Sequence, residues 1–365
     1  MKRYGNLFNS TFSEEALYRA YLSASKGKKK TKSYLQFSAH LGAELYLLRE
    51  ELLSGDYRLR PYRRLKIQTP KPRDILAPHF RDVVVQHAIY ATIYPIFNRS
   101  FIHTSFACRK GKGTHAASDC AYHAMQEHDT DLCTLHLDVR RFFSSIDREI
   151  LVGLLKRKIK DDRLLAVMEL FCSSADGSTG IPLGNLLSQL YALIYLNPAD
   201  HFIKRVLKVN RYVRYVDDMV LIGMTRPVAK KLQEVIKGFL ADKLHLNLSK
   251  WSLRRIREGI NFVGYRTWPT HRLIRKYSLQ KFRRAVAKGK DETAWSIIAH
   301  AQWTSSLKIM KNIISRSNRM VIHLPLSHKR RLGLCCLPNN LICMGSIWPE
   351  PSLNWSWTSW PASDF

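Results

Sequence analysis

Two adjacent aspartates inside an apolar stretch constrain this chain more than any other feature. Residues 211–223 read RYVRYVDDMVLIG, so apolar and β-branched residues flank Asp217 and Asp218. The pattern predicts a β-hairpin with both acids at its turn. Two neighbouring carboxylates on an apolar hairpin are costly to keep ionised unless a cation lies beside them, and a divalent metal would supply that charge. An ordinary acidic turn is the alternative, because aspartate favours turns.

The charge of the chain indicates a polyanionic partner. Lysine and arginine number 59 against 29 acidic residues, which gives a formal net charge of +30 over 365 residues. Such an excess favours nucleic acid or an anionic membrane surface. The chain also has 16 Tyr, 15 Phe and 8 Trp, and aromatic rings stack on bases, so nucleic acid is favoured. No apolar run approaches the length of a membrane span, and we expect no membrane partner.

The seven cysteines favour free thiols. Their number is odd, and no pair has the C-x-x-C spacing of a zinc site. The amino terminus, MKRYG, lacks the apolar core of a secretory signal. Both observations predict a protein of a reducing cytoplasm.

Residue patterns predict mixed α and β structure. Helices are expected within 1–60, at 80–97, 147–172, 185–206 and 227–241, and over a basic stretch at 272–315. Strands are expected at 65–68, 133–138, 244–251 and 261–268. The stretch 321–365 holds five of the 14 prolines and four of the eight tryptophans, with little periodicity. We predict that it is a tail outside the core.

A third acid, Asp138, ends the strand expected at 133–138. If that strand lies beside the hairpin in one sheet, Asp138 joins Asp217 and Asp218 at one rim. Mg²⁺ prefers carboxylate oxygens and keeps other positions for water and substrate phosphate. Two such ions about 3.5–4 Å apart assist in-line phosphoryl transfer. The three acids therefore predict a site for that chemistry.

Three motifs, in order, resemble those of reverse transcriptases. Tyr215 to Asp218 (YVDD) resembles the Y-x-D-D box, 137–147 (LDVRRFFSSID) resembles the first acidic motif, and 180–189 (GIPLGNLLSQ) resembles the motif between them. Residues 70–73 (PKPR) and 106–109 (FACR) are similar to fingers segments, and Gly264 with Tyr265 to the primer grip. The similarity covers roughly residues 30–305.

The resemblance implies an α+β right-hand polymerase fold, with fingers, a palm built on an antiparallel sheet and a short helical thumb. Residues 1–60 would form an N-terminal helical extension of the fingers, 61–268 the fingers and palm, 269–320 a basic helical thumb, and 321–365 the Trp-, Pro- and Ser-rich tail. The implied activity is RNA-directed DNA synthesis from dNTPs on a primer, with two Mg²⁺ ions that Mn²⁺ could replace.

The middle motif resembles one subgroup. Residues 183–189 read LGNLLSQ, which looks like the reverse transcriptases of diversity-generating retroelements, whereas most retroviral and group II intron enzymes carry Q-G-x-x-x-S-P. This implies that a template-repeat RNA is copied with errors at adenines, and that the mutagenised cDNA diversifies a target gene. It also implies a small basic ring-forming accessory protein and a bacterial or phage-encoded origin.

Two alternatives stay open. One is a group II intron-like, retron or phage-defence reverse transcriptase, which would share the fold. The other belongs to a different class, a catalytically idle nucleic-acid-binding protein; three intact acids argue against it.

Leu183 carries a hypothesis about accuracy. A glutamine at this position could hydrogen-bond the incoming nucleotide, and leucine cannot. Losing a polar contact of about 1 kcal/mol weakens discrimination between right and wrong pairs. Leu183 would then contribute to low fidelity; alternatively, it is a core residue at the start of a helix.

The resemblance also assigns roles by position. The catalytic residues would be Asp138, Asp217 and Asp218, and the metal ligands would be these three with Val139. The nucleotide would contact Lys71, Arg73, Phe143, Leu183 and Gly184. Template and primer would contact Arg109, Ser188, Gln189, Tyr215, Gly264 and Tyr265.

Several of these residues have a simpler alternative. Lys71 and Arg73 could form a solvated basic turn, Phe143 could be a core aromatic, and Ser188 and Gln189 could merely pack their helix. Lys250 lies where some relatives have a lysine proposed to protonate pyrophosphate, or it is a surface lysine. Asp147 and Asp242 are expected to be cap or surface acids rather than ligands.

Overall fold

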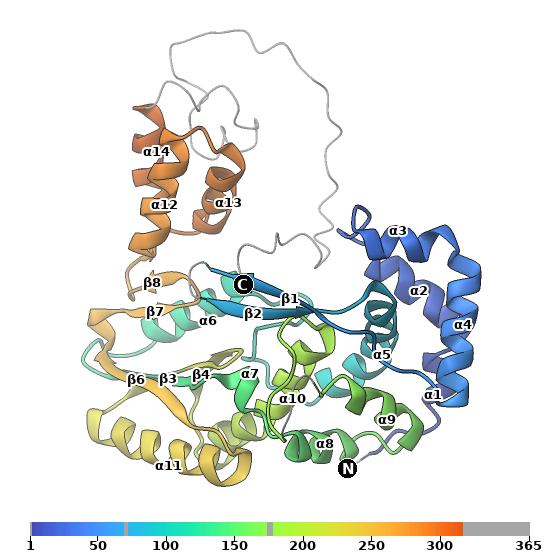
Figure 1. Cartoon of the computed structure of the whole chain (residues 1–365). Helices are drawn as coiled ribbons and strands as arrows, with labels where there is room; N and C mark the ends of the chain where they lie inside the picture. The colour runs from blue at the N-terminus through green and yellow to red at the C-terminus, as the bar shows by residue number, and fades with distance from the viewer. Residues whose placement is uncertain (1, 69–71, 174–177, 317–365) are drawn as a thin grey trace.

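The computed structural model describes residues 2–68, 72–173 and 178–316. The tail at 321–365 and the end of the expected thumb, 317–320, lie outside these ranges. Figure 1 shows a sheet-containing palm, N-terminal helices on one side of it, and the C-terminal helices standing above its other side. This arrangement of helices and antiparallel sheets confirms the α+β right-hand fold.

The palm is built on a four-stranded sheet with the order β4-β5-β3-β6. Every neighbouring pair in it is antiparallel. Its strands are β3 (Cys133–Val139), β4 (Arg211–Tyr215), β5 (Asp218–Met224) and β6 (Leu248–Arg255). The hairpin predicted around the two acids is β4–β5, and the strand ending at Asp138 is β3, one position further into the sheet.

The two faces of the palm sheet enter different cores, because successive side chains of a strand point to opposite faces. Leu135, Leu137 and Leu221 belong to the main core. Val213 and Val220 pack with Phe262 and the apolar side of α6 (Thr114–Gln126) in a separate cluster. The acids of the palm lie on the α6 side, since Asp138 and Asp218 share the face of Val220.

The main core is organised around two long helices. Helix α5 (Phe80–Asn98) contacts α10 (Leu186–His201), and α10 contacts α11 (Arg226–Leu244), which covers β3. Helix α10 continues into a π-helical turn, Phe202–Val206. Pro227 lies in the first turn of α11, where the missing N–H of proline costs nothing. These helices confirm the stretches expected at 80–97, 185–206 and 227–241.

The N-terminal helices form the layer that we predicted to be an extension of the fingers. They are α1 (Phe8–Thr11), α2 (Glu14–Ala24), α3 (Lys32–Ala39) and α4 (Leu41–Ser54). Ser13 caps α2 by accepting a hydrogen bond from the Ala16 N–H. Tyr21 and Phe37 pack edge-on against Phe80 at the start of α5, which attaches this layer to the palm. The antiparallel pair β1 (Arg63–Ile67) and β2 (Arg73–Ala77) extends from it.

The thumb has its own hydrophobic core. A three-stranded sheet of β7 (Ile260–Phe262), β8 (Tyr265–Thr267) and β9 (Arg272–Ile274) leads into α12 (Lys276–Ala287), α13 (Asp291–Ala301) and α14 (Ser306–Ser315). Phe282, Ile298 and Ile314 are among its buried members, and none of them belongs to the main core. The thumb therefore packs as a separate unit on the palm (Figure 1).

Some predicted boundaries were wrong. The single helix expected at 147–172 is two helices, α8 (Arg148–Lys156) and α9 (Asp162–Leu170), because Asp161 starts a new helix as its cap. The strand expected at 244–251 begins later, since α11 extends to Leu244. The strand expected at 261–268 is the hairpin β7–β8, and the start of the basic stretch at 272–315 is strand β9. Among the described residues no helix is both long and apolar enough to span a membrane.

Candidate active site

The register of the palm sheet brings the three predicted acids to one end of it. Asp138 on β3 lies directly opposite Asp218 on β5, and Tyr215 on β4 lies opposite Asp218 from the other side. Asp217 occupies the two-residue turn of the hairpin together with Val216. Directly opposite residues have Cβ atoms about 4.5–5.5 Å apart. Strand pairing therefore juxtaposes acids that lie about 80 residues apart in sequence, as their numbering shows.

Neighbouring side chains hold two of these carboxylates. The Nε2 atom of His136 contacts Oδ1 of Asp218, and the Ser249 hydroxyl donates to Oδ2 of Asp138. Because β-strand side chains alternate, His136 and Asp138 share a face, and His136 also packs edge-on against Phe262. The exposed Lys250 lies opposite Asp138 on β6. Tyr215, Asp218, Asp138 and Lys250 thus form one row across the sheet.

Asp217 has the most perturbed electrostatics of the three. Burial, and to a smaller extent the negative charges of Asp138 and Asp218, raise the pKa of its carboxyl group to about 6. Its own backbone N–H and the Arg214 guanidinium act in the opposite direction, but they do not compensate. The turn therefore concentrates negative charge that is poorly solvated, a situation that a cation would relieve.

The carboxylate oxygens of the three acids are suitable ligands for a hard divalent cation. Three carboxylates offer the oxygen ligands that Mg²⁺ prefers. Among the residues that the structure describes, no three His, Cys, Asp or Glu side chains are grouped as a metal site. The carboxylate of Asp218 instead contacts His136, and that of Asp138 accepts from Ser249.

The segments predicted to contact the nucleotide are tied together through their backbones. The Ile181 N–H donates to the Phe143 carbonyl at 2.9 Å, and the Leu76 N–H on β2 donates to the Leu183 carbonyl at 2.7 Å. Phe143 lies on the short helix α7 (Phe142–Ser145) and is half-buried against the main core. These two bonds thus link the fingers strand β2, the segment at 181–184 and α7.

Gly184 is required where it stands. Its φ is +120°, which L side chains rarely adopt, and a Cβ atom there would lie 2.6 Å from the Leu76 carbonyl oxygen. The exposed Gly184 therefore allows β2 to approach the turn closely. Lys71 lies outside the described residues, and Arg73 starts β2 opposite Ile67.

The predicted template contacts of Arg109 and Ser188 conflict with where their side chains lie. Arg109 is 7 % exposed. Its guanidinium donates to the Asn98 side chain and to the carbonyls of Ile102 and Ser105, all within 2.9 Å. Ser188 is 1 % exposed inside α10, and Gln189 is half-buried beside it. This packing favours structural roles for both residues. For Ser188, packing of its helix was the alternative stated above.

The primer-grip residues join the palm to the thumb. Tyr265 is 1 % exposed, its hydroxyl lies 2.8 Å from Nδ1 of His115 on α6, and it donates to the His300 carbonyl on α13 at 2.7 Å. Gly264 has a φ of +91°, and a Cβ atom there would lie 2.8 Å from Nε2 of His300. The Tyr265 side chain therefore packs between α6 and α13, and the glycine at 264 leaves room for His300.

The acids expected to be structural behave as expected. Asp147 caps α8 by accepting from the N–H groups of Glu149 and Ile150. Burial alone would raise the pKa of this carboxyl group, but those bonds and one from His245 lower it overall. Asp242 is exposed on α11.

The cysteines at 108, 120, 133 and 172 are free thiols.

Several residues of the site escaped the motif comparison. His136 and Ser249 contact the acids, and Arg214 with Asp200 lies behind the turn. The signal for His136 was available, because it precedes Asp138 by two residues on a strand and must share its face. No comparable signal links Asp200 to Arg214.

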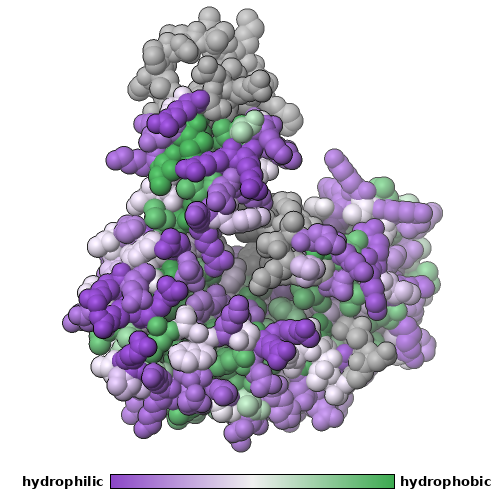
Figure 2. All heavy atoms as spheres, turned by 60° about the vertical axis from the view of Figure 1, so that its left-hand side comes forward, coloured by the Kyte–Doolittle hydropathy of each residue, from purple (hydrophilic) through white to green (hydrophobic). Residues whose placement is uncertain are grey.

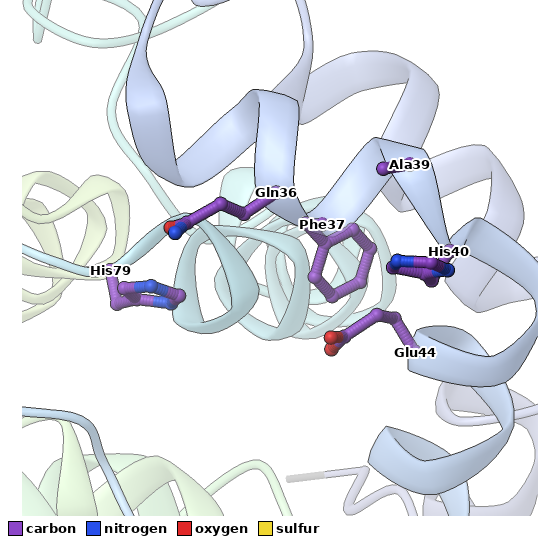
Figure 3. A pocket seen from close by; sticks show the side chains of 6 residues that line it. All are labelled: Gln36, Phe37, Ala39, His40, Glu44 and His79. Atoms are coloured by element: carbon purple, nitrogen blue, oxygen red, sulfur yellow. The ribbon is translucent and has the colours of Figure 1, made fainter.

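A hollow on the fingers is a poor alternative site. Its volume is about 490 Å³, and it lies between α3, α4 and His79. Figure 3 shows that Gln36, His40, Glu44 and His79 point around it from these separate elements. None of the three palm acids lines it, so the rim of the palm sheet is the better candidate for catalysis.

The raised pKa of Asp217 predicts a measurable cost in stability. A folded-state pKa near 6 against an ordinary 3.8 means that stability falls as pH rises from about 4 to 6 and stays reduced above it. In EDTA at pH 8 we expect the free energy of unfolding of Asp217→Asn to exceed that of the wild type by about 3 kcal/mol, with a higher melting temperature, and to match it near pH 4. Asp242→Asn is the exposed control. Equal stability of Asp217→Asn and wild type at pH 8 would refute this electrostatic account.

Comparison with known proteins identifies the family. Residues 66–267 match the family described as reverse transcriptase (RNA-dependent DNA polymerase). Protein YkfC of Escherichia coli K12 is 28% identical over 313 residues, covering 72% of this chain and 79% of that protein. The group II intron-encoded protein LtrA of Lactococcus lactis is 26% identical over 291 residues, covering 59% of this chain and 48% of LtrA.

Among solved structures, apo telomerase from Candida tropicalis aligns with a TM-score of 0.48 at 11% identity, covering 75% of this chain and 58% of that one. The chain spans about half the length of LtrA and somewhat more of the telomerase. The family match takes in both Asp138 and the hairpin with Asp217, and it extends over more than half of the residues. This chain therefore belongs to the reverse transcriptase family, the RNA-dependent DNA polymerases.

Proposed function

We propose that Asp138, Asp217 and Asp218 form the catalytic centre for copying RNA into DNA. The observation that carries this proposal is the strand register, which sets Asp138 opposite Asp218 at the turn that bears Asp217. The three carboxylates, with the carbonyl of Val139 at the end of β3, would hold two Mg²⁺ ions. When bound, these ions supply charge stabilisation for the attacking and leaving oxygens of phosphoryl transfer.

The chain's own groups prepare this site. Asp217, whose ionised form is destabilised by burial and by its neighbours, gains most from a cation. His136 orients the carboxylate of Asp218, and Ser249 orients that of Asp138, before these oxygens bind a metal ion. Lys250, opposite Asp138 and exposed, is placed where it could donate a proton to the departing pyrophosphate, or it remains a surface lysine.

The nucleotide would occupy the surface formed by α7, the turn at 183–184 and β2. The half-buried Phe143 follows Asp138 by five residues and would restrict the space at the sugar 2′ position. Gly184 keeps the turn close to the fingers strand. Arg73, and Lys71 beyond the described residues, would bind the triphosphate, for which the planar guanidinium is better suited than an ammonium group.

Template and primer would lie between the palm and the thumb. Figure 2 shows hydrophilic side chains over much of the visible face of both. The thumb helix α12 contributes exposed basic residues, Tyr277 in the same helix is 59 % exposed, and Trp303, which follows α13, is 63 % exposed. Backbone phosphates and stacked bases are the natural partners of such a surface. The formal charge of +30 supports the same partner.

For the biological role, we propose mutagenic copying of a template-repeat RNA. The motif LGNLLSQ and the apolar Leu183 beside the nucleotide surface support this proposal. An accessory protein that is small, basic and ring-forming belongs to the same proposal. A group II intron-like role is the second candidate, favoured by the relationship to LtrA. The idle nucleic-acid-binding alternative keeps RNA binding but predicts no DNA synthesis.

Primer extension tests the catalytic assignment. With an RNA template, a DNA primer, dNTPs and Mg²⁺, we expect extension by the wild type, and a loss of at least about 10²-fold in Asp217→Asn and Asp138→Asn. Asp242→Asn, an exposed acid on α11, should extend normally. RNA binding measured in parallel separates the idle alternative, in which the wild type binds RNA and makes no product.

Sequencing of the products tests the role of Leu183. Wild-type products should carry misincorporations concentrated opposite template adenines, and Leu183→Gln should lower their frequency because a polar contact to the nucleotide is regained. Leu183→Met is the control, since it keeps an apolar side chain of similar volume. An unchanged error spectrum in Leu183→Gln would leave Leu183 as a packing residue, and accurate wild-type products would favour the group II-like role.

A further inference from the structure

An arginine lies buried directly behind the acidic turn. Arg214 on β4 is 0% exposed and precedes Asp217 by three residues. Its Nε atom donates to Oδ1 of Asp200 at 2.7 Å, and its Nη2 atom donates to Oδ2 at 2.6 Å. Asp200, on α10, is also 0% exposed. The pair has the two-pronged geometry that fixes a guanidinium plane in one orientation.

The remaining nitrogen of Arg214 reaches the turn itself. Its Nη1 atom donates to the carbonyl oxygen of Val216 at 2.8 Å. Val216 has a φ of +55°, a left-handed conformation that is a genuine outlier for a β-branched residue. Such strain persists only where the surroundings over-determine it, and it is concentrated at functional sites. The arginine is therefore the side chain that holds the backbone immediately before Asp217.

The Arg214–Asp200 pair, called the clamp below, connects the two halves of the proposed site. Helix α10 begins at Leu186, just after the turn at 183–184 beside the nucleotide surface, and carries Asp200 near its other end. Tyr212 also donates to Asp200, at 2.7 Å, so the carboxylate accepts three hydrogen bonds from two side chains. One rigid helix thus positions both the nucleotide turn and, through Asp200 and Arg214, the acidic turn.

Stability alone is a weak reason for such a pair. Taking two charges out of water costs several kcal/mol each, and well-packed apolar residues often serve as well. The backbone of Arg214 has independent support, because its N–H donates to the Thr104 carbonyl at 2.9 Å and its carbonyl accepts from Phe106 at 3.0 Å. Strand β4 does not need the guanidinium to stay in the sheet, whereas the Val216 turn does.

We propose that Arg214 and Asp200 are positioning residues that hold Val216 in its left-handed conformation and thereby aim Asp217. This inference rests on the proposed role of Asp217, which touches the reacting groups, whereas Arg214 and Asp200 act through the backbone. It assigns the strain at Val216 to the clamp and makes the geometry of the catalytic turn depend on α10.

The first test measures the turn without using activity. Arg214→Lys loses the two-pronged pairing with Asp200 and the hydrogen bond to the Val216 carbonyl. Asp200→Asn weakens the same pairing while the side chain keeps its volume. In both we expect faster amide hydrogen exchange, by about tenfold, in peptides covering residues 215–219. Exchange in β3 and α10 should change little. Arg81→Lys is the matched control, since Arg81 is a 5% exposed arginine of the fingers paired with Glu51.

The second test asks whether strain relief restores function. Arg214→Lys should lower kcat by about a hundredfold, with the KM for dNTP within about threefold of wild type. Asparagine tolerates left-handed backbone, so Val216→Asn should recover most of the lost kcat in the Arg214→Lys background. Val216→Asn in the wild-type background is measured alongside as the reference for that recovery. Asp200→Asn serves in the same way if Arg214→Lys folds poorly.

The outcomes separate the clamp from the catalytic assignment. Unchanged exchange at 215–219 in both Arg214→Lys and Asp200→Asn would overturn the clamp, and so would a loss of kcat that Val216→Asn fails to recover. If exchange rises as expected while Asp217→Asn retains full polymerase activity, the clamp stands and the role proposed for Asp217 falls. Faster exchange together with recovery by Val216→Asn would support both.

Discussion

Repulsion among three carboxylates at the end of the palm sheet is the constraint on which the site depends. Antiparallel pairing sets Asp138 opposite Asp218, and the hairpin turn adds Asp217, whose pKa is raised to about 6 by burial and by those two charges. A fold that only needed stability would not collect these groups. Their neighbours His136 and Ser249 moderate the repulsion, and a hard divalent cation would remove most of it.

The surrounding architecture keeps this costly arrangement in place. Helix α10 packs in the main core and holds Arg214 through Asp200, and Arg214 in turn holds the strained Val216 next to Asp217. At the other end of α10, the Leu183 carbonyl bonds to β2 of the fingers. Palm, fingers and acidic turn therefore share one helix, while the thumb has a core of its own and joins through Tyr265.

Much of this could be predicted from the sequence, and the omissions have physical reasons. The hairpin at Asp217 and Asp218 and the strand ending at Asp138 were predictable because alternation and turn chemistry are local signals. The bond between Arg214 and Asp200 joins a strand to a helix through side-chain direction, which local patterns do not encode. Motif position suggested that Arg109 and Ser188 face a template, but burial is set by packing partners far along the chain.

Binding of Mn²⁺ tests the central claim, that the three acids form a divalent-cation site, without requiring catalysis. Titration of the metal-free full-length protein can be followed by the electron paramagnetic resonance of free Mn²⁺. We predict binding by the wild type and by Asp242→Asn, and affinity weaker by at least about tenfold in Asp138→Asn and Asp217→Asn. Equal affinity in all four proteins, or no binding by the wild type in the presence of dNTP, would contradict the account.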